Sequence, residues 1–119
     1  MTTHKYFSVK RLIKACGYSW KGLTFAWRNE TAFQQESLLL LIMLPFALWW
    51  PESKLESAIL VMSLFIVLIT ELLNTGIEAA INRHGEAHHP WSGVAKDVAS
   101  AAVLLGLIQC ALVWLLVLL

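Results

Sequence analysis

The chain has 119 residues, of which 58% are hydrophobic and 14% are charged, and its mean hydropathy is +0.65. This composition is too apolar for an ordinary soluble domain, and the length leaves room for one domain only. The formal net charge is +1, and no nucleic-acid partner is expected.

The first predicted element is an amphipathic helix over residues 6–28. Its apolar residues, which include Trp20 and Trp27, recur mostly every three to five positions, with basic residues between them. A helix of this kind lies in the membrane interface and turns its basic side toward anionic lipid or ligand. The opening residues lack the apolar core and small-residue site of a cleaved signal peptide.

Three apolar segments follow, at residues 31–50, 55–81 and 94–119. A hydrocarbon core about 30 Å thick is crossed by ~20 residues of helix. The second segment would extend about 40 Å at 1.5 Å per residue, so its far end is expected to protrude. The predicted fold is therefore an all-α membrane protein, with a surface helix followed by three transmembrane helices.

Basic residues are distributed unevenly along this arrangement. Six of the nine precede the first span, Lys54 alone lies in the first loop, and Arg83 and Lys96 flank the second loop. The positive-inside rule then places the N-terminus and the second loop in the cytoplasm. The first loop and the C-terminus are expected on the other side.

A polar stripe ends the second predicted span. Glu71, Asn74, Glu78 and Asn82 are spaced by three, four and four residues, which places them on one face of a helix. An ionised carboxylate that faces lipid costs about 3 kcal/mol or more at mid-depth. Glu71 is therefore expected to face protein, water or a cation. The alternative, that both carboxylates are simply solvated at the helix end, suits Glu78 better than Glu71.

The predicted topology brings five of the eight acidic residues to one membrane surface, namely Glu30, Glu36, Glu71, Glu78 and Asp97. Paired carboxylates suit Mg²⁺, which commonly arrives carrying phosphates, and nearby Lys or Arg would neutralise those phosphates. A further carboxylate, partly out of water, suits a general base that acts on a hydroxyl. The residues permit phosphoryl transfer, although the nucleotide motifs of P-loop proteins and protein kinases do not occur.

The histidines and cysteines give weaker signals. His84, His88 and His89 occupy a loop without a supporting Cys or a well-spaced acid, so we expect them to be solvated. Cys16 and Cys110 are far apart and offer neither metal spacing nor an evident disulfide.

Four motifs make the chain resemble the prokaryotic diacylglycerol kinase family. They are KACGYSWKGL (14–23), NETAFQQE (29–36), ELLNTGIEAAIN (71–82) and SGVAKDVASAAV (92–103), and the third matches the family signature. The resemblance implies a homotrimer in the bacterial inner membrane, with a periplasmic C-terminus. It also implies that ATP with Mg²⁺ phosphorylates the free hydroxyl of diacylglycerol to give phosphatidic acid.

The resemblance further implies a role for particular residues. Glu71 would be the catalytic base, Asn74 would orient groups in the polar stripe, and Glu30 and Glu78 would hold Mg²⁺. The nucleotide would be contacted by Arg11, Tyr18, Glu30, Glu78, Lys96 and Asp97. The lipid would be seated by Ala15, Cys16, Gly17, Tyr18, Ser19, Trp20, Trp27, Glu36, Glu71 and Ser100.

Four positions depart from the family pattern. Gly76 stands where the signature usually has Ala or Ser, and Asn82 where it usually has Asp. Gln34 and Val94 stand where Arg is expected in well-known members. None of these positions is a proposed base or metal ligand, so the resemblance still implies activity.

Two alternatives to diacylglycerol phosphorylation remain open from the sequence. A relative in Gram-positive bacteria phosphorylates undecaprenol with the same site chemistry, although the GYSWKG and NETAFQQE segments favour diacylglycerol. A small proton-relay or transport subunit also carries intramembrane carboxylates. That class predicts polar residues throughout the bilayer depth, whereas here they gather at one end. A purely structural subunit would leave Glu71 unexplained.

Overall fold

The computed structural model describes residues 8–83 and 89–119, and all regular structure in these ranges is α-helical. The helices are α1 (Val9–Asn29), α2 (Thr31–Trp49), α3 (Lys54–Asn82) and α4 (Pro90–Leu118). α2, α3 and α4 are each long and apolar enough to cross a membrane. The predicted all-α fold with three spanning helices is confirmed.

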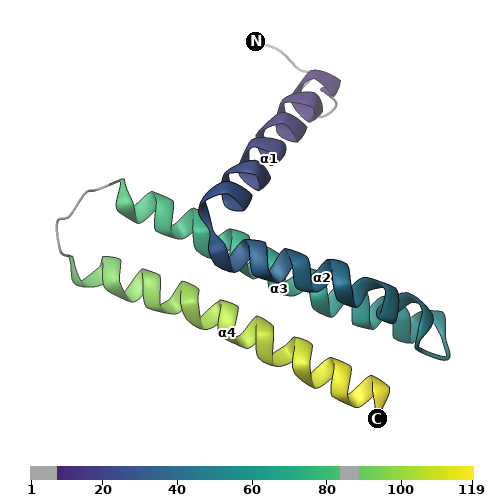
Figure 1. Ribbon diagram of the computed structural model, residues 1–119. Coiled ribbons are helices and arrows are strands. Elements are labelled where there is room, and N and C mark those ends of the chain that lie inside the picture. Colours follow the sequence, from purple (N-terminus) through teal and green to yellow (C-terminus); the bar gives the residue numbers. More distant parts are fainter. Residues whose placement is uncertain (1–7, 84–88) are drawn as a thin grey trace.

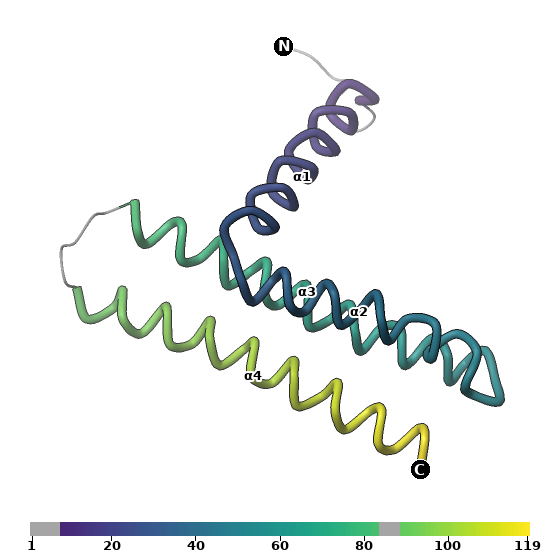
Figure 2. Tube along the Cα trace, in the orientation of Figure 1, coloured from purple at the N-terminus to yellow at the C-terminus, as the bar shows by residue number. Residues whose placement is uncertain are grey.

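α3 is the central helix of the bundle. α2 and α4 each pack along α3, and within the described ranges α2 and α4 do not pack directly on one another. α2 is shorter than α3 and begins beside the C-terminal part of α3, so the last turns of α3 extend beyond it (Figure 1). α1 leaves the bundle at a steep angle and meets α2 and α3 only near its C-terminal end (Figure 2).

Side-chain caps determine where three of the helices begin. The Ser8 hydroxyl accepts a hydrogen bond from the backbone N–H of Arg11 at 3.1 Å, and Ser53 does the same for Glu56 at 3.2 Å. His89 Nδ1 accepts from the Trp91 N–H at 3.2 Å, and proline occupies the first position of α4. α4 therefore begins earlier than the predicted residue 94, because the cap precedes the apolar run.

A single extended residue joins α1 to α2. Glu30 has φ −118° and ψ 107°, and its N–H still bonds to the Ala26 carbonyl at 2.9 Å. Ala26 is fully buried against the bundle. This junction turns the chain sharply and places Glu30 at the start of α2.

α4 packs on α3 through very few buried residues. Only Ala99 and Gly106 of α4 are buried. A Cβ atom added to Gly106 would lie 2.9 Å from Thr70 Oγ1, a distance at which real Cβ atoms are essentially not found. Gly106 therefore permits the close approach of α4 to α3, as small residues do between membrane helices.

Gly106→Val is expected to destabilise the folded protein by about 1–3 kcal/mol, because the added side chain overpacks the Thr70 contact. The measurement is thermal or denaturant unfolding in detergent micelles. Gly93→Val is the matched control, since Gly93 lies on the same helix and has nothing within 4 Å of an added Cβ. Equal stability changes in the two variants would contradict this account of the contact.

Candidate functional site

Four carboxylates gather where the α1–α2 junction lies beside α3. Glu71 of α3 is 4% exposed, and Glu30, Glu36 and Glu78 are half-buried. The charges of Glu30 and Glu78 act on Glu71, and that of Glu71 acts on Glu36. Because like charges repel one another, the group favours a bound cation or a shared proton.

Hydrogen bonds connect the polar stripe within α3 and to α4. Asn74 Nδ2 donates to Glu78 Oε1 at 3.2 Å, and Lys96 Nζ donates to Asn82 Oδ1 at 2.9 Å. Asn74 Oδ1 is buried and has no hydrogen-bond partner. The stripe thus ends at a lysine from another helix, with an acceptor left free along it.

The single chain keeps several predicted site residues apart from these carboxylates. Arg11 and Tyr18 are exposed on α1, and the N-terminal part of that helix projects from the bundle (Figure 1). The Lys21 ammonium lies 5.9 Å from the centre of the Tyr18 ring. Other exposed members of the predicted set are Ala15, Cys16, Gly17, Ser19, Trp20, Trp27, Asp97 and Ser100.

The histidine loop falls largely outside the described residues, since His84 and His88 are not among them. His89 is described, and its ring caps the start of α4. Within the described ranges, no group of three or more His, Cys, Asp or Glu side chains is close enough to hold a metal ion unaided.

The donor chemistry of the site nevertheless fits Mg²⁺ that arrives with other ligands. The charges of Glu30 and Glu78 both act on Glu71. Their carboxylate oxygens are the kind of ligand that this hard cation prefers. Glu36 Oε2 and Asn74 Oδ1 are buried without hydrogen-bond partners. Mg²⁺ usually keeps waters and takes one or two carboxylates together with substrate phosphates, so a two-carboxylate set is sufficient.

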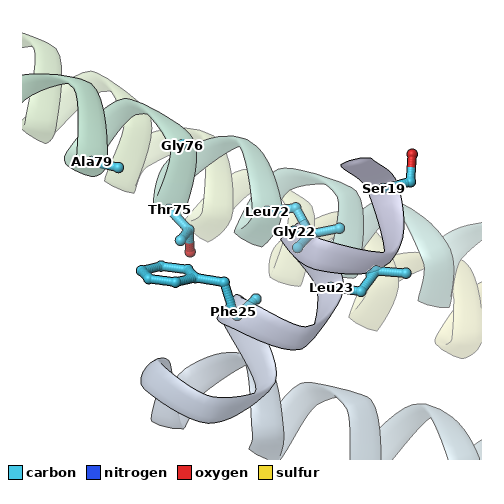
Figure 3. A pocket seen from close by; sticks show the side chains of 9 residues that line it. Ser19, Gly22, Leu23, Phe25, Leu72, Thr75, Gly76 and Ala79 are labelled. Atoms are coloured by element: carbon cyan, nitrogen blue, oxygen red, sulfur yellow. The ribbon is translucent and has the colours of Figure 1, made fainter. Parts of the chain in front are cut away.

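An apolar groove of about 530 Å³ runs between α1 and α3 on one side of this site. Figure 3 shows Thr75 beside the Phe25 ring within the groove. Thr75 is 7% exposed, and its hydroxyl has no hydrogen-bond partner. The lining residues are Ser19, Gly22, Leu23, Phe25, Ala26, Leu72, Thr75, Gly76 and Ala79.

Among these lining residues, the family resemblance gave a site role to Ser19 alone and marked Gly76 only as a departure from the signature. A signal for the α3 side was available, because Leu72, Thr75, Gly76 and Ala79 share a helix face next to Glu71. No local pattern could show that Phe25 of α1 would cover that face.

Comparisons with known proteins match most of this chain. The family model described as prokaryotic diacylglycerol kinase matches residues 17–118. The diacylglycerol kinase of Escherichia coli (strain K12) is 45% identical over 104 residues, which are 87% of this chain and 85% of the relative.

More distant relatives extend over more of the chain. The diacylglycerol kinase of Haemophilus influenzae is 37% identical over 111 residues, 93% of this chain and 94% of the relative. The diacylglycerol kinase of Pseudomonas aeruginosa is 39% identical over 111 residues, which are 93% of this chain and 90% of the relative. These relatives are enzymes that act on a lipid alcohol, so the transport-subunit alternative is not supported. The chain belongs to the prokaryotic diacylglycerol kinase family.

Proposed function

We propose that this membrane kinase transfers the γ-phosphoryl group of ATP to the free hydroxyl of diacylglycerol. In this reaction the hydroxyl oxygen forms a bond to the γ-phosphorus, and the bond from that phosphorus to the ADP oxygen breaks. The hydroxyl proton passes to a base, and the products are phosphatidic acid and ADP. The observation that carries the proposal is the buried Glu71 carboxylate among three other carboxylates at one end of the bundle.

Glu71 is the base in this proposal. Its side chain is almost wholly enclosed, yet it belongs to the polar stripe at the end of an apolar helix, where a lipid hydroxyl can approach from the bilayer. Proton removal by a positioned carboxylate contributes typically about 10²–10⁴-fold to rate. Asn74, which bonds to Glu78 at 3.2 Å, keeps the stripe oriented.

The nucleotide binds toward the wet end of the stripe. Glu30 and Glu78 would hold Mg²⁺, which supplies charge neutralisation for the phosphates. Lys96 already reaches the stripe through its 2.9 Å bond to Asn82, and Asp97 is adjacent. Arg11 and Tyr18, exposed on α1, would complete the nucleotide contacts.

The lipid chains lie against the apolar surface beside the carboxylates. The groove between α1 and α3 has the size of a small-molecule site, and it opens from the same α3 segment that carries Glu71. Residues 15–20, Trp27, Glu36 and Ser100 would seat the rest of the lipid. The unpartnered Thr75 hydroxyl offers the groove one polar contact.

Two wider features belong to the same proposal. The basic residues of α1 and the Lys96 end of α4 support a cytoplasmic active face in the inner membrane, with the C-terminus periplasmic. A homotrimer would bring a second chain to the half-open polar stripe. It would also allow Arg11 and Tyr18 of one copy to reach the carboxylates of another.

Gly76→Leu is expected to raise the KM for diacylglycerol several-fold and leave the KM for MgATP unchanged. Gly76 lines the α1–α3 groove and has nothing within 4 Å of an added Cβ, so a leucine side chain would occupy space for lipid. Gly76→Ala is the control. It should keep both KM values and stabilise α3 by up to about 1 kcal/mol. Unchanged lipid kinetics in Gly76→Leu would exclude this groove as the lipid site.

The direct test of the proposed function is phosphoryl transfer from radiolabelled ATP in mixed micelles. Parallel reactions contain diacylglycerol, undecaprenol or neither lipid, and each is repeated with Mg²⁺ removed by a chelator. We expect labelled phosphatidic acid only with diacylglycerol and Mg²⁺. Preferential labelling of undecaprenol would overturn the choice of substrate, and label transfer without a divalent metal would overturn the metal role.

A further inference from the structure

A polar cluster lies within the apolar part of the α3–α4 contact, eight residues along α3 from Glu71. Glu36 is nearer, since it lines a cavity of about 240 Å³ together with Cys110 and Trp114. Ser63 of α3 is 1% exposed, and its backbone carbonyl accepts a hydrogen bond from Gln109 Nε2 at 2.9 Å. Its hydroxyl donates to the Leu60 carbonyl at 2.6 Å and accepts from Trp114 Nε1 at 3.0 Å. Cys110 Sγ lies 3.7 Å from the same hydroxyl.

This cluster lies where the bilayer makes hydrogen bonds hard to replace. Ser63 is about 14 Å from the N-terminal end of α3 at 1.5 Å per residue, which places it well inside an apolar helix. No water is available to polar groups there, so separation of α4 from α3 would leave Trp114 Nε1 without a partner and Gln109 Nε2 with only its 2.9 Å bond to the Gly106 carbonyl of its own helix. The bonds are therefore expected to persist in the folded protein.

The cluster also helps to fix the register of α4 on α3 within the bilayer. Lipid and apolar side chains solvate one another equally well, so apolar helix faces in a membrane hold a register weakly. Only Ala99 and Gly106 of α4 are buried. The specific links between α3 and α4 are the two hydrogen bonds to Ser63, the Lys96–Asn82 bond at the other end and the close contact of Gly106 with Thr70.

Register matters because α4 carries Lys96 and Asp97 at its other end. Gln109 is about 20 Å along the helix from Lys96, so a rigid helix transmits a shift at one point to the other. A slip of one turn moves Lys96 by about 5.4 Å. Its 2.9 Å bond to Asn82 would not survive such a displacement.

We infer that Gln109 and Trp114 are positioning residues, which fix the placement of Lys96 and Asp97 at the nucleotide site by holding α4 to Ser63. This inference rests on the proposed function, because it uses the nucleotide role given to Lys96 and Asp97. It predicts that substitutions of Gln109 or Trp114, which lie deep in the bilayer, change the KM for MgATP at the Lys96 end of α4.

The test compares KM and kcat for Gln109→Leu and Trp114→Phe at a temperature well below unfolding. Both variants are expected to raise the KM for MgATP about three- to tenfold. This is the change in an equilibrium constant that corresponds to the free energy of one interhelical hydrogen bond in a membrane. In Gln109→Leu the KM for diacylglycerol should stay unchanged, because Gln109 does not line the cavity that holds Glu36. Leu40→Ala is the control, because it enlarges the cavity that Leu40 shares with Trp114 and lowers stability, yet leaves both hydrogen bonds to Ser63 in place.

A rescue experiment separates register from general stability. Ser63→Cys, added to Gln109→Leu, places a thiol opposite Cys110 at the site of the present 3.7 Å contact. The oxidised protein, with its disulfide verified by mass spectrometry, should recover the MgATP KM, and reduction should abolish the recovery.

Two results would overturn separate claims. An unchanged MgATP KM in Gln109→Leu and Trp114→Phe, with lowered melting temperatures like that of Leu40→Ala, would show a merely structural role for the cluster. Failure of the unaltered protein to transfer phosphate from ATP to diacylglycerol would instead refute the proposed function itself.

Discussion

Glu71→Gln is expected to lower the phosphorylation of diacylglycerol by at least about a hundredfold, because it removes the proposed base while preserving the size of the side chain. Glu71 is buried, the charges of Glu30 and Glu78 act on it, and its own charge acts on Glu36. Loss of one negative charge from this group should leave the unliganded protein folded. The measurements are kcat in mixed micelles and thermal unfolding in the same detergent.

Glu52→Gln is the matched control for this loss of charge. Glu52 is exposed in the α2–α3 turn, at the opposite end of the bundle, so the same chemical change there should leave kcat unaltered. A Glu71→Gln variant with near-normal turnover would remove Glu71 as the base. Reduced activity together with an unfolded protein would assign the residue to the fold.

Glu78→Gln is expected to raise the Mg²⁺ concentration for half-maximal activity by about tenfold or more, since the amide keeps an acceptor but loses the charge that favours a hard cation. The bond that Glu78 accepts from Asn74 at 3.2 Å can be retained by the glutamine oxygen. The decisive measurement is therefore a Mg²⁺ titration at fixed ATP, followed for both kcat and the KM for MgATP.

Glu56→Gln serves as the comparison for metal dependence. Glu56 lies in the first turn of α3, far from the carboxylate group along the same helix, so its Mg²⁺ titration should match that of the unaltered protein. An unchanged titration in Glu78→Gln would count against its role as a ligand. Activity that returns at high Mg²⁺ would distinguish a metal defect from a loss of the base.

Much of the fold was predictable because its signals are local. The three spans follow from continuous apolar length, and the polar stripe follows from helical periodicity in residues 71–82. The start of α4 was placed too late, because the prediction followed the apolar run and missed the His89 cap with Pro90 behind it. Helix ends depend on a few capping atoms, whereas helix existence depends on many residues.

The site was predictable in part, for a related reason. Glu71, Glu78 and Asn74 lie on one helix, so their spacing alone places them on one face. The sequence assigned Glu30, Glu36 and Glu71 to the same membrane surface. In the structure, the charge of Glu30 acts on Glu71 and that of Glu71 acts on Glu36.

The sequence by itself determined the membrane class, the helices, the stripe and the family motifs, because each depends on residues close together in the chain. Only the tertiary structure decided that Phe25 covers Thr75 and that Trp114 bonds to Ser63. These contacts join residues about 50 positions apart. They depend on the angle of α1 and the register of α4, which side-chain packing between helices sets and no local pattern records.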